Sequence, residues 1–230
     1  MRARIIDLAK EFGRYGYKTI TSMLNMEGWP VGKDMVYTIW CEEGLKVPSK
    51  QPKKGRLWLQ DGSCVRKRPE YKNHVWSYDF VFDRTHNGRP IKILNIMDEY
   101  SRKCLLSFAA RRIRSQDVIL LLAELFLKYG IPKYIRSDNG PEFIAKKLRE
   151  WFHTLNVEPL FIEPGSPWEN GYIESFNGKM RDQFLNGEIF YSLKEAKILI
   201  ERWRHHYNKV RPHSSLGGVL PVPETIWLAG

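Results

Sequence analysis

The 230-residue sequence has few cysteines and no long apolar segment. Its three cysteines, Cys41, Cys64 and Cys104, are widely spaced and contain no Cys-x-x-Cys pair, which argues against a disulfide framework and a zinc knuckle. The longest apolar run, Val118 to Leu127, contains Glu124 and is too short to cross a bilayer. No signal-peptide pattern begins the sequence. We therefore expect a protein of the reducing cytoplasm, without a membrane partner.

The sequence also has fewer acidic residues than basic residues. The chain has 26 Asp and Glu residues against 37 Lys and Arg residues, which leaves a net charge of +11. Such an excess is typical of proteins that bind a polyanion, most often nucleic acid, although a basic enzyme can have the same balance without that partner. The hydrophobic fraction of 43% is enough for a packed core at this length.

The first 72 residues divide into a helical region and a basic linker. Residues 1–46 show apolar residues at helical spacing in three short segments, and the Gly-containing break at 28–32 gives them a helix-turn-helix outline. Residues 47–72 follow as a linker, in a stretch rich in lysine, arginine, proline and glycine. This arm is either a solvated tether or a segment that follows DNA phosphates.

From residue 73 the pattern changes to that of a sheet. Aromatic residues alternate along 75–83, and two further strand patterns complete an antiparallel meander. A helix capped by Ser115 comes next, and strands and helices then alternate. The expected strands are 75–83, 91–97, 104–109, 133–137 and 157–162, and the expected helices are 115–129, 141–155 and one from about 168.

This order predicts an α/β fold, a mixed sheet flanked by helices, over residues 73–190. A last helix begins at the capping box from Ser192 to Glu195. We expect residues 191–230, this helix and an irregular tail, to pack on the core.

Three carboxylates stand at the ends or centres of these elements. Asp79 lies within an apolar strand, Asp138 ends another strand, and Glu174 lies near the start of a helix. An ionised carboxylate in an apolar setting is costly unless it has a partner, and a bound cation is the obvious one. Each acid taken alone is more often structural. The three contexts together favour metal-assisted phosphoryl transfer, with all three acids as catalytic residues and metal ligands.

Basic and polar residues near these acids are candidates for DNA contacts. Arg181 follows Glu174 by two helical turns, so both project from nearly the same face, where Arg181 could hold a phosphate. Asn139 and Gly140 follow Asp138 in a turn that lets backbone approach a ligand. An exposed helix charge and an ordinary turn are the simpler interpretations. The predicted DNA-binding residues are Arg181, Lys179, Asn139, Lys53, Lys54, Arg56, Arg66, Lys67 and Arg68.

Three motifs resemble a known family. They are Trp76-Ser-Tyr-Asp-Phe80, Ile135-Arg-Ser-Asp-Asn-Gly-Pro-Glu-Phe143 and the segment from Pro164 to Gly178. Together they look like the DDE integrase core of bacterial insertion-sequence transposases. The sequence is most similar to the second-frame, OrfB-like product of the group encoded in two overlapping frames. The segments Tyr207-Asn-Lys-Val-Arg-Pro-His-Ser-Ser-Leu216 and Tyr15-Gly-Tyr-Lys-Thr-Ile20 also resemble that group.

The resemblance implies an RNase H-like fold and metal-dependent strand cleavage followed by 3′-hydroxyl strand transfer at the element's ends. Asp79, Asp138 and Glu174 match the family's acidic triad, and Arg181 matches its basic residue. The implied cofactor is Mg²⁺, as two ions, with Mn²⁺ able to substitute. The implied partners are double-stranded DNA of the element ends and the target, further copies of the chain during synapsis, and an upstream first-frame product. Such a protein works in the cytoplasm at the nucleoid.

Two other functions fit parts of the sequence. A non-catalytic regulator would use the N-terminal helices to bind DNA and would need no acidic triad. An RNase H-like nuclease would use the triad without strand transfer and would need neither the basic arm nor the N-terminal helices. The intact triad argues against the first alternative, and the arm and helices argue mildly against the second.

Overall fold

The computed structural model describes residues 1–48, 67–138, 140, 146–161 and 170–222. Its contacts divide the chain into two compact units, Met1–Gly62 with His206–Gly230, and Ser63–His205. Among the described residues, no helix combines the length and the apolar character that a membrane span requires.

The first unit contains the three helices expected from the sequence. They are α1 (Arg2–Glu11), α2 (Tyr17–Met26) and α3 (Lys33–Glu42). Their apolar faces meet in one core, because the apolar residues recur at helical spacing. The residues fully buried there include Ile5, Leu8, Ile20, Leu24 and Val36. The C-terminal segment belongs to the same unit, since the Tyr15 hydroxyl forms a 2.6 Å hydrogen bond with His206 Nε2.

The second unit contains a five-stranded mixed sheet in the order β3-β2-β1-β4-β5. The strands are β1 (Val75–Arg84), β2 (Pro90–Asp98), β3 (Cys104–Ala110), β4 (Tyr134–Ser137) and β5 (Glu158–Phe161). The first three form an antiparallel meander, whereas β4 runs parallel to β1 and β5 runs parallel to β4. The predicted mixed sheet is therefore confirmed.

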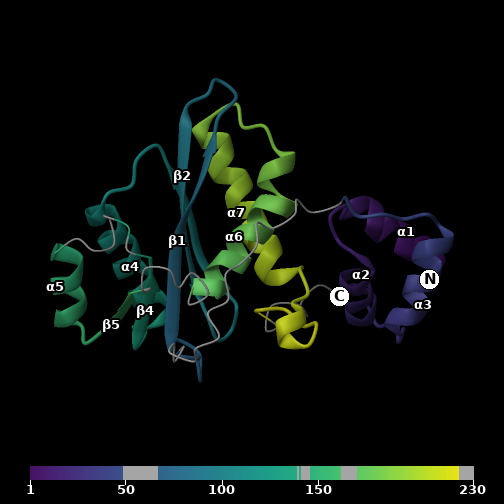
Figure 1. The fold of residues 1–230 in the computed structure, drawn as a ribbon, viewed down its shortest axis with the longest axis horizontal. Coiled ribbons are helices and arrows are strands. Elements are labelled where there is room, and N and C mark those ends of the chain that lie inside the picture. The colour runs from purple at the N-terminus through teal and green to yellow at the C-terminus, as the bar shows by residue number, and fades with distance from the viewer. Residues whose placement is uncertain (49–66, 139, 141–145, 162–169, 223–230) are drawn as a thin grey trace, which may run out of the picture. The chain divides into compact units, whose positions relative to one another are not determined.

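Helices cover both faces of this sheet (Figure 1). The helices α4 (Ser115–Tyr129) and α5 (Lys146–Thr154) lie on one face, and α6 (Gly171–Gln183) and α7 (Leu193–Lys209) lie on the other. Two short 3-10 helices, Leu185–Gly187 and Ser214–Leu216, follow α6 and α7. This arrangement confirms the helix-flanked sheet that the order of elements predicts.

The two predicted helix caps have different outcomes. At the start of α7, Ser192 Oγ accepts a 3.0 Å hydrogen bond from the Glu195 amide, as the capping box predicts. Ser115, in contrast, is not the cap of α4. The cap position is occupied by Arg114, and the Asp117 carboxylate accepts a 2.8 Å hydrogen bond from the Arg114 amide. A carboxylate one turn into a helix can satisfy this free amide without help from a serine hydroxyl.

The alternation along β1 decides which side chains are buried on which face. Trp76 and Tyr78 belong to the core formed with α4 and α5, where Trp76 lies against Phe126 with ring centroids 5.5 Å apart. Because successive strand residues point to opposite faces, Ser77 and Asp79 point toward α6. The strand thus buries its aromatic residues on one face and brings an acid beneath a helix on the other.

Candidate active site

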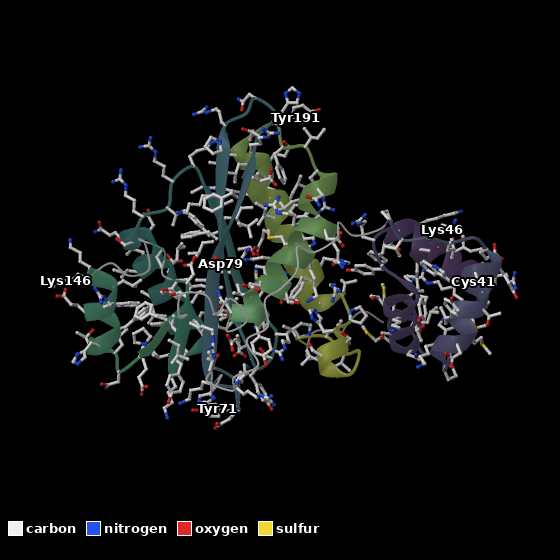
Figure 2. The ribbon with its side chains drawn as sticks, viewed as in Figure 1. Cys41, Lys46, Tyr71, Asp79, Lys146 and Tyr191 are labelled. Atoms are coloured by element: carbon white, nitrogen blue, oxygen red, sulfur yellow. The ribbon has the colours of Figure 1, made fainter. Side chains whose placement is uncertain are left out.

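Asp79 lies near the middle of β1, between Tyr71 at one end of the sheet and Tyr191 at the other (Figure 2). The parallel register between β1 and β4 pairs Val75 with Tyr134 and Ser77 with Arg136. Continued by two residues, this register brings Asp138 level with Asp79 on the neighbouring strand. The exposed Asp138 follows the last residue of β4 directly.

Glu174 comes from a different element, the first turn of α6, and α6 lies beside β1 (Figure 1). A carboxylate is favourable at this position because the amino end of a helix carries partial positive charge. Two adjacent strands and one covering helix therefore bring the three sequence-predicted acids into one region, although they are far apart in the chain.

The Asp79 carboxylate has a fixed orientation. Its Oδ1 accepts a 2.7 Å hydrogen bond from the Phe80 amide, and its Oδ2 accepts a 2.8 Å hydrogen bond from Asn177 Nδ2. Asn177 Oδ1 in turn accepts a 2.8 Å hydrogen bond from Asn95 Nδ2, and Asn95 is the partner of Asp79 across the β1–β2 pair. These two hydrogen bonds fix the orientation of the Asn177 side-chain amide, and Asn177 in turn fixes the orientation of the Asp79 carboxylate.

The sequence prediction did not include Asn177 or Asn95. A signal for Asn177 exists, because it follows Glu174 by three residues and so lies on the same helix face. Asn95 has no comparable local signal, since only the strand register places it opposite Asp79.

The electrostatic setting of Asp79 is unusual for a surface acid. Burial, with the nearby charges of Asp138 and Glu174, raises the pKa of its carboxyl from 3.8 to about 6, against the opposing effect of the Phe80 and Asn177 hydrogen bonds. The three acids are therefore close enough to affect one another. Their negative charges make ionisation of Asp79 unfavourable unless a cation compensates.

The donor chemistry of this group fits a hard divalent cation, because Mg²⁺ prefers carboxylate oxygens and usually retains several waters. Within the described ranges, no three acidic, histidine or cysteine side chains converge closely enough to hold a metal ion together. Asp79, Asp138 and Glu174 therefore match a metal in donor type alone.

The predicted DNA-contacting residues have varied environments. Arg181 is exposed, and its Nη2 donates a 2.6 Å hydrogen bond to the carbonyl of Phe82, three residues along β1 from Asp79. Lys179 Nζ donates to Ser175 Oγ of the same helix at 2.6 Å. These contacts place Arg181 on the α6 side of β1.

Two arm residues are described at the end of the linker. Lys67 Nζ donates a 2.5 Å hydrogen bond to the Tyr134 hydroxyl and lies 3.8 Å from the centre of that ring, whereas Arg68 is exposed. Lys67 therefore anchors the end of the arm to β4. The other predicted contacts lie outside the described residues: Asn139, Lys53, Lys54, Arg56 and Arg66.

Protein-family models match almost the entire chain. A model of the integrase core domain matches residues 69–167, and a second model with the same description matches residues 155–221. A model of an HTH-like domain matches residues 1–53. The two integrase-core matches together cover more than half of the sequence.

Curated relatives come from bacterial insertion elements. The chain is 37% identical to the uncharacterized 39.2 kDa protein of insertion element IS476 from Xanthomonas euvesicatoria, over 96% of this chain and 63% of that protein. It is 34% identical to the uncharacterized 31.7 kDa protein of IS407 from Burkholderia multivorans, over 96% of this chain and 79% of that protein. It is 26% identical to the transposase InsD of IS2D from Escherichia coli, over 93% of this chain and 74% of that protein. The chain thus spans between 63% and 79% of the length of these relatives.

Solved structures share the fold at low sequence identity. The catalytic core domain of HTLV-2 integrase in complex with magnesium is 18% identical, with a TM-score of 0.51 over 65% of this chain and 94% of that chain. One chain in the structure of the simian T-cell lymphotropic virus intasome in complex with the PP2A regulatory subunit B56 gamma is 16% identical to this chain. Its TM-score is 0.57, over 98% of this chain and 76% of that chain. The family models and the insertion-element relatives show that the chain belongs to the OrfB-like insertion-sequence transposases, with an HTH-like domain followed by an integrase-like catalytic core.

Proposed function

We propose that this protein cleaves DNA strands at the ends of its insertion element and joins the freed 3′-hydroxyls to target DNA. The observation that carries the proposal is the placement of Asp79 and Asp138 at one level of adjacent strands, beside the helix that carries Glu174. The raised pKa of Asp79 supports the proposal. An acid that is buried beside two other carboxylates has such a pKa when no cation is bound, and perturbed pKa values of this kind are common in active sites.

Asp79, Asp138 and Glu174 are the residues that would hold the metal, which we propose is Mg²⁺ as two ions, with Mn²⁺ able to substitute. When bound, such ions supply an activated oxygen nucleophile and neutralise the charge that develops on the phosphodiester. Asn177 would hold the Asp79 carboxylate in one orientation throughout. Arg181 would bind a DNA phosphate on the α6 side of β1, where its contact with the Phe82 carbonyl already restricts it.

The reaction proceeds in two displacements at phosphorus. A water oxygen first attacks a phosphodiester at the element end, and the 3′-oxygen leaves with a proton as a free hydroxyl. That hydroxyl then attacks a phosphodiester of the target, and the target's own 3′-oxygen leaves. Each displacement forms one P–O bond and breaks one, so no covalent bond between protein and DNA is required. Detection of a protein–DNA adduct during turnover would contradict this scheme.

The HTH-like domain and the integrase core imply a DNA partner. We infer that the N-terminal helices and the basic arm bind the element ends, and that the core acts on the ends and the target. We also infer that several copies assemble around paired ends, with a first-frame product as a further partner, at the nucleoid in the cytoplasm.

Cleavage of a labelled duplex that carries the element's own end tests the proposal. Asp79→Ala and Glu174→Ala should abolish Mg²⁺-dependent cleavage and leave DNA binding intact, because a missing carboxylate removes a metal ligand without altering the basic surfaces. Asp83→Ala is the matched control, since Asp83 lies on the same face of β1. Full cleavage by either triad variant would refute the proposal, and cleavage without joined products would favour a nuclease.

A further inference from the structure

A buried ion pair involves Arg136, which precedes Asp138 by two residues. Arg136 of β4 donates from Nε to Glu99 Oε1 at 3.0 Å, and the two side chains are 4% and 0% exposed. The same guanidinium donates from Nη2 to the Lys67 carbonyl at 2.7 Å. One arginine therefore joins three segments: the strand that leads to Asp138, the turn after β2, and the end of the basic arm.

Stability alone does not explain this ion pair. Removal of two charges from water costs several kcal/mol per ion, and apolar residues of similar volume often stabilise a fold equally well. A guanidinium differs from apolar groups because its donors lie in a fixed plane, so it sets the relative positions of its acceptors. The advantage of Arg136 over an apolar residue is therefore geometric.

The turn that carries Glu99 also reaches α6. Arg102 Nη1 donates a hydrogen bond to the Glu99 carbonyl, and the Arg102 guanidinium lies 3.7 Å from the centre of the Tyr172 ring. Arg102 has a φ of 62°, a left-handed conformation that is unfavourable for a residue with a side chain. Such a conformation persists only where the surroundings hold it, and it is often found near functional sites.

The two arginines thus reach both sides of the candidate site. Arg136 precedes Asp138 by two residues on β4, and Tyr172 precedes Glu174 by two residues on α6. Glu99 links the arginines, through its carboxylate to Arg136 and through its carbonyl to Arg102.

We propose that Arg136, Glu99 and Arg102 are positioning residues that fix the end of β4 relative to the start of α6, and thereby Asp138 relative to Glu174. The inference rests on the proposed function, because it assigns these two acids to one reaction centre. The three residues act through the elements that they hold, and a contact of their own with DNA or metal is not needed.

The double replacement Arg136→Met with Glu99→Leu tests this positioning role. It exchanges the ion pair for apolar groups of similar volume, which should preserve folding. We expect the turnover number for cleavage to fall about 10- to 100-fold, as for other residues that orient metal ligands. The KM for DNA should change less than the turnover number, because among the described residues the only link to the DNA-binding arm that is lost is the hydrogen bond to the Lys67 carbonyl. Arg136→Lys keeps the positive charge but not the planar set of donors. Its turnover number should lie between those of the wild type and the double variant.

A second ion pair in the same unit provides a matched control. Arg204 donates to Glu201 from Nε at 2.7 Å, and from Nη1 to the Cys104 carbonyl at 3.1 Å. It therefore also joins a carboxylate to the backbone of another element, but it holds α7 against β3. Arg204→Met with Glu201→Leu should leave the turnover number within about twofold of wild type, since neither element carries a predicted catalytic acid.

Arg102→Gly provides an independent variant. Glycine adopts a positive φ without steric cost, so this replacement relieves the backbone while it removes the contact with Tyr172. The melting temperature should therefore be maintained or rise, and the turnover number should fall. If Arg102 has only a structural role, Arg102→Gly should lower the melting temperature or leave the turnover number unchanged.

Metal-dependent stabilisation is a readout that needs no cleavage. Mn²⁺ or Mg²⁺ should raise the melting temperature of the wild type, and Arg136→Met with Glu99→Leu should weaken this rise. If the wild type fails to cleave but the double variant still loses the rise, the positioning role survives and the proposed function fails. If the folded double variant keeps wild-type turnover and the full rise, the positioning role is overturned. A wild type with neither cleavage nor a rise overturns both.

Discussion

Replacement of Asp79 by asparagine should make the folded sheet unit more stable at neutral pH. Burial, with the charges of Asp138 and Glu174, raises the pKa of the Asp79 carboxyl from 3.8 to about 6. A raised pKa means that folding favours the protonated form. The cost is small below the unfolded value of 3.8, grows as the pH rises toward 6, and is complete above that range.

The size of the effect follows from the shift in pKa. A difference of about two units corresponds to about 3 kcal/mol at pH 7.5, and linkage reduces this cost to about 0.5 kcal/mol at pH 4. Asparagine has nearly the same shape and removes the charge, but its Nδ2 cannot accept one of the two hydrogen bonds that Asp79 receives from Phe80 and Asn177, and that loss costs about 1 kcal/mol. We therefore expect Asp79→Asn to gain about 1–2 kcal/mol at pH 7.5 and to gain nothing at pH 4.

Asp83→Asn is the control for this measurement. Asp83 lies on the same strand and accepts a 2.7 Å hydrogen bond from the Arg84 amide, which parallels the 2.7 Å bond from Phe80 to Asp79. Its replacement should change stability by less than about 0.5 kcal/mol, because Asp83 is only half-buried and burial does not oppose its charge as it does at Asp79. Native-state hydrogen exchange of peptides from β1 measures the sheet unit separately from the N-terminal helices.

Two outcomes of the Asp79→Asn measurement would contradict a cost of burying the Asp79 charge. If Asp79→Asn stabilises the sheet unit no more than Asp83→Asn does at pH 7.5, burial of the Asp79 charge does not destabilise the fold. If the gain is equal at pH 7.5 and pH 4, its cause is packing and not ionisation. Added Mg²⁺ should stabilise the wild type at pH 7.5 and stabilise Asp79→Asn much less, because a cation offsets only a charge that exists.

Three further variants test the Asn177 donor to Asp79, the phosphate contact proposed for Arg181 and the effect of His206 on the acid stability of the first unit. Asn177→Ala should lower cleavage about 10- to 100-fold in a turnover assay, because Asp79 loses its orienting donor; wild-type turnover would exclude that role. Arg181→Ala should reduce the slope of log affinity against log salt by about 1 in DNA-binding titrations, and an unchanged slope would rule out a phosphate contact. Burial, with the charge of Arg211, lowers the pKa of His206 from 6.5 to about 4, so the first unit should lose stability as the pH falls from 6.5 toward 4. His206→Gln should flatten that dependence in acid titrations, and an equally steep loss would contradict it.

The cost predicted for Asp79 agrees with its assigned role. Functional sites often retain groups that destabilise the fold, since their chemistry requires a charge where an apolar core would be more stable. The hydrogen bonds from Phe80 and Asn177 offset part of this cost while they orient the carboxylate. A stabilised but inactive Asp79→Asn variant would show both consequences in one molecule.

Most elements of the fold could be predicted because their signals are local. Alternation along 75–83 marks β1 to within one residue, and the apolar spacing within 17–26 marks α2 at its observed bounds. The start of α4 was less predictable, since Arg114 rather than Ser115 occupies the cap position. Several side chains can satisfy the same free amide, so composition alone does not choose among them.

The sequence by itself determined the element order, the basic arm of residues 47–72 and the identity of the three candidate acids, because each depends on residues close together in the chain. Only the tertiary structure decided what surrounds those acids. Asn177 and Asp79 are 98 positions apart, and Arg136 and Glu99 are 37 positions apart, yet each pair shares a hydrogen bond. Strand register and helix packing create these contacts, and no local periodicity records which distant residues will meet.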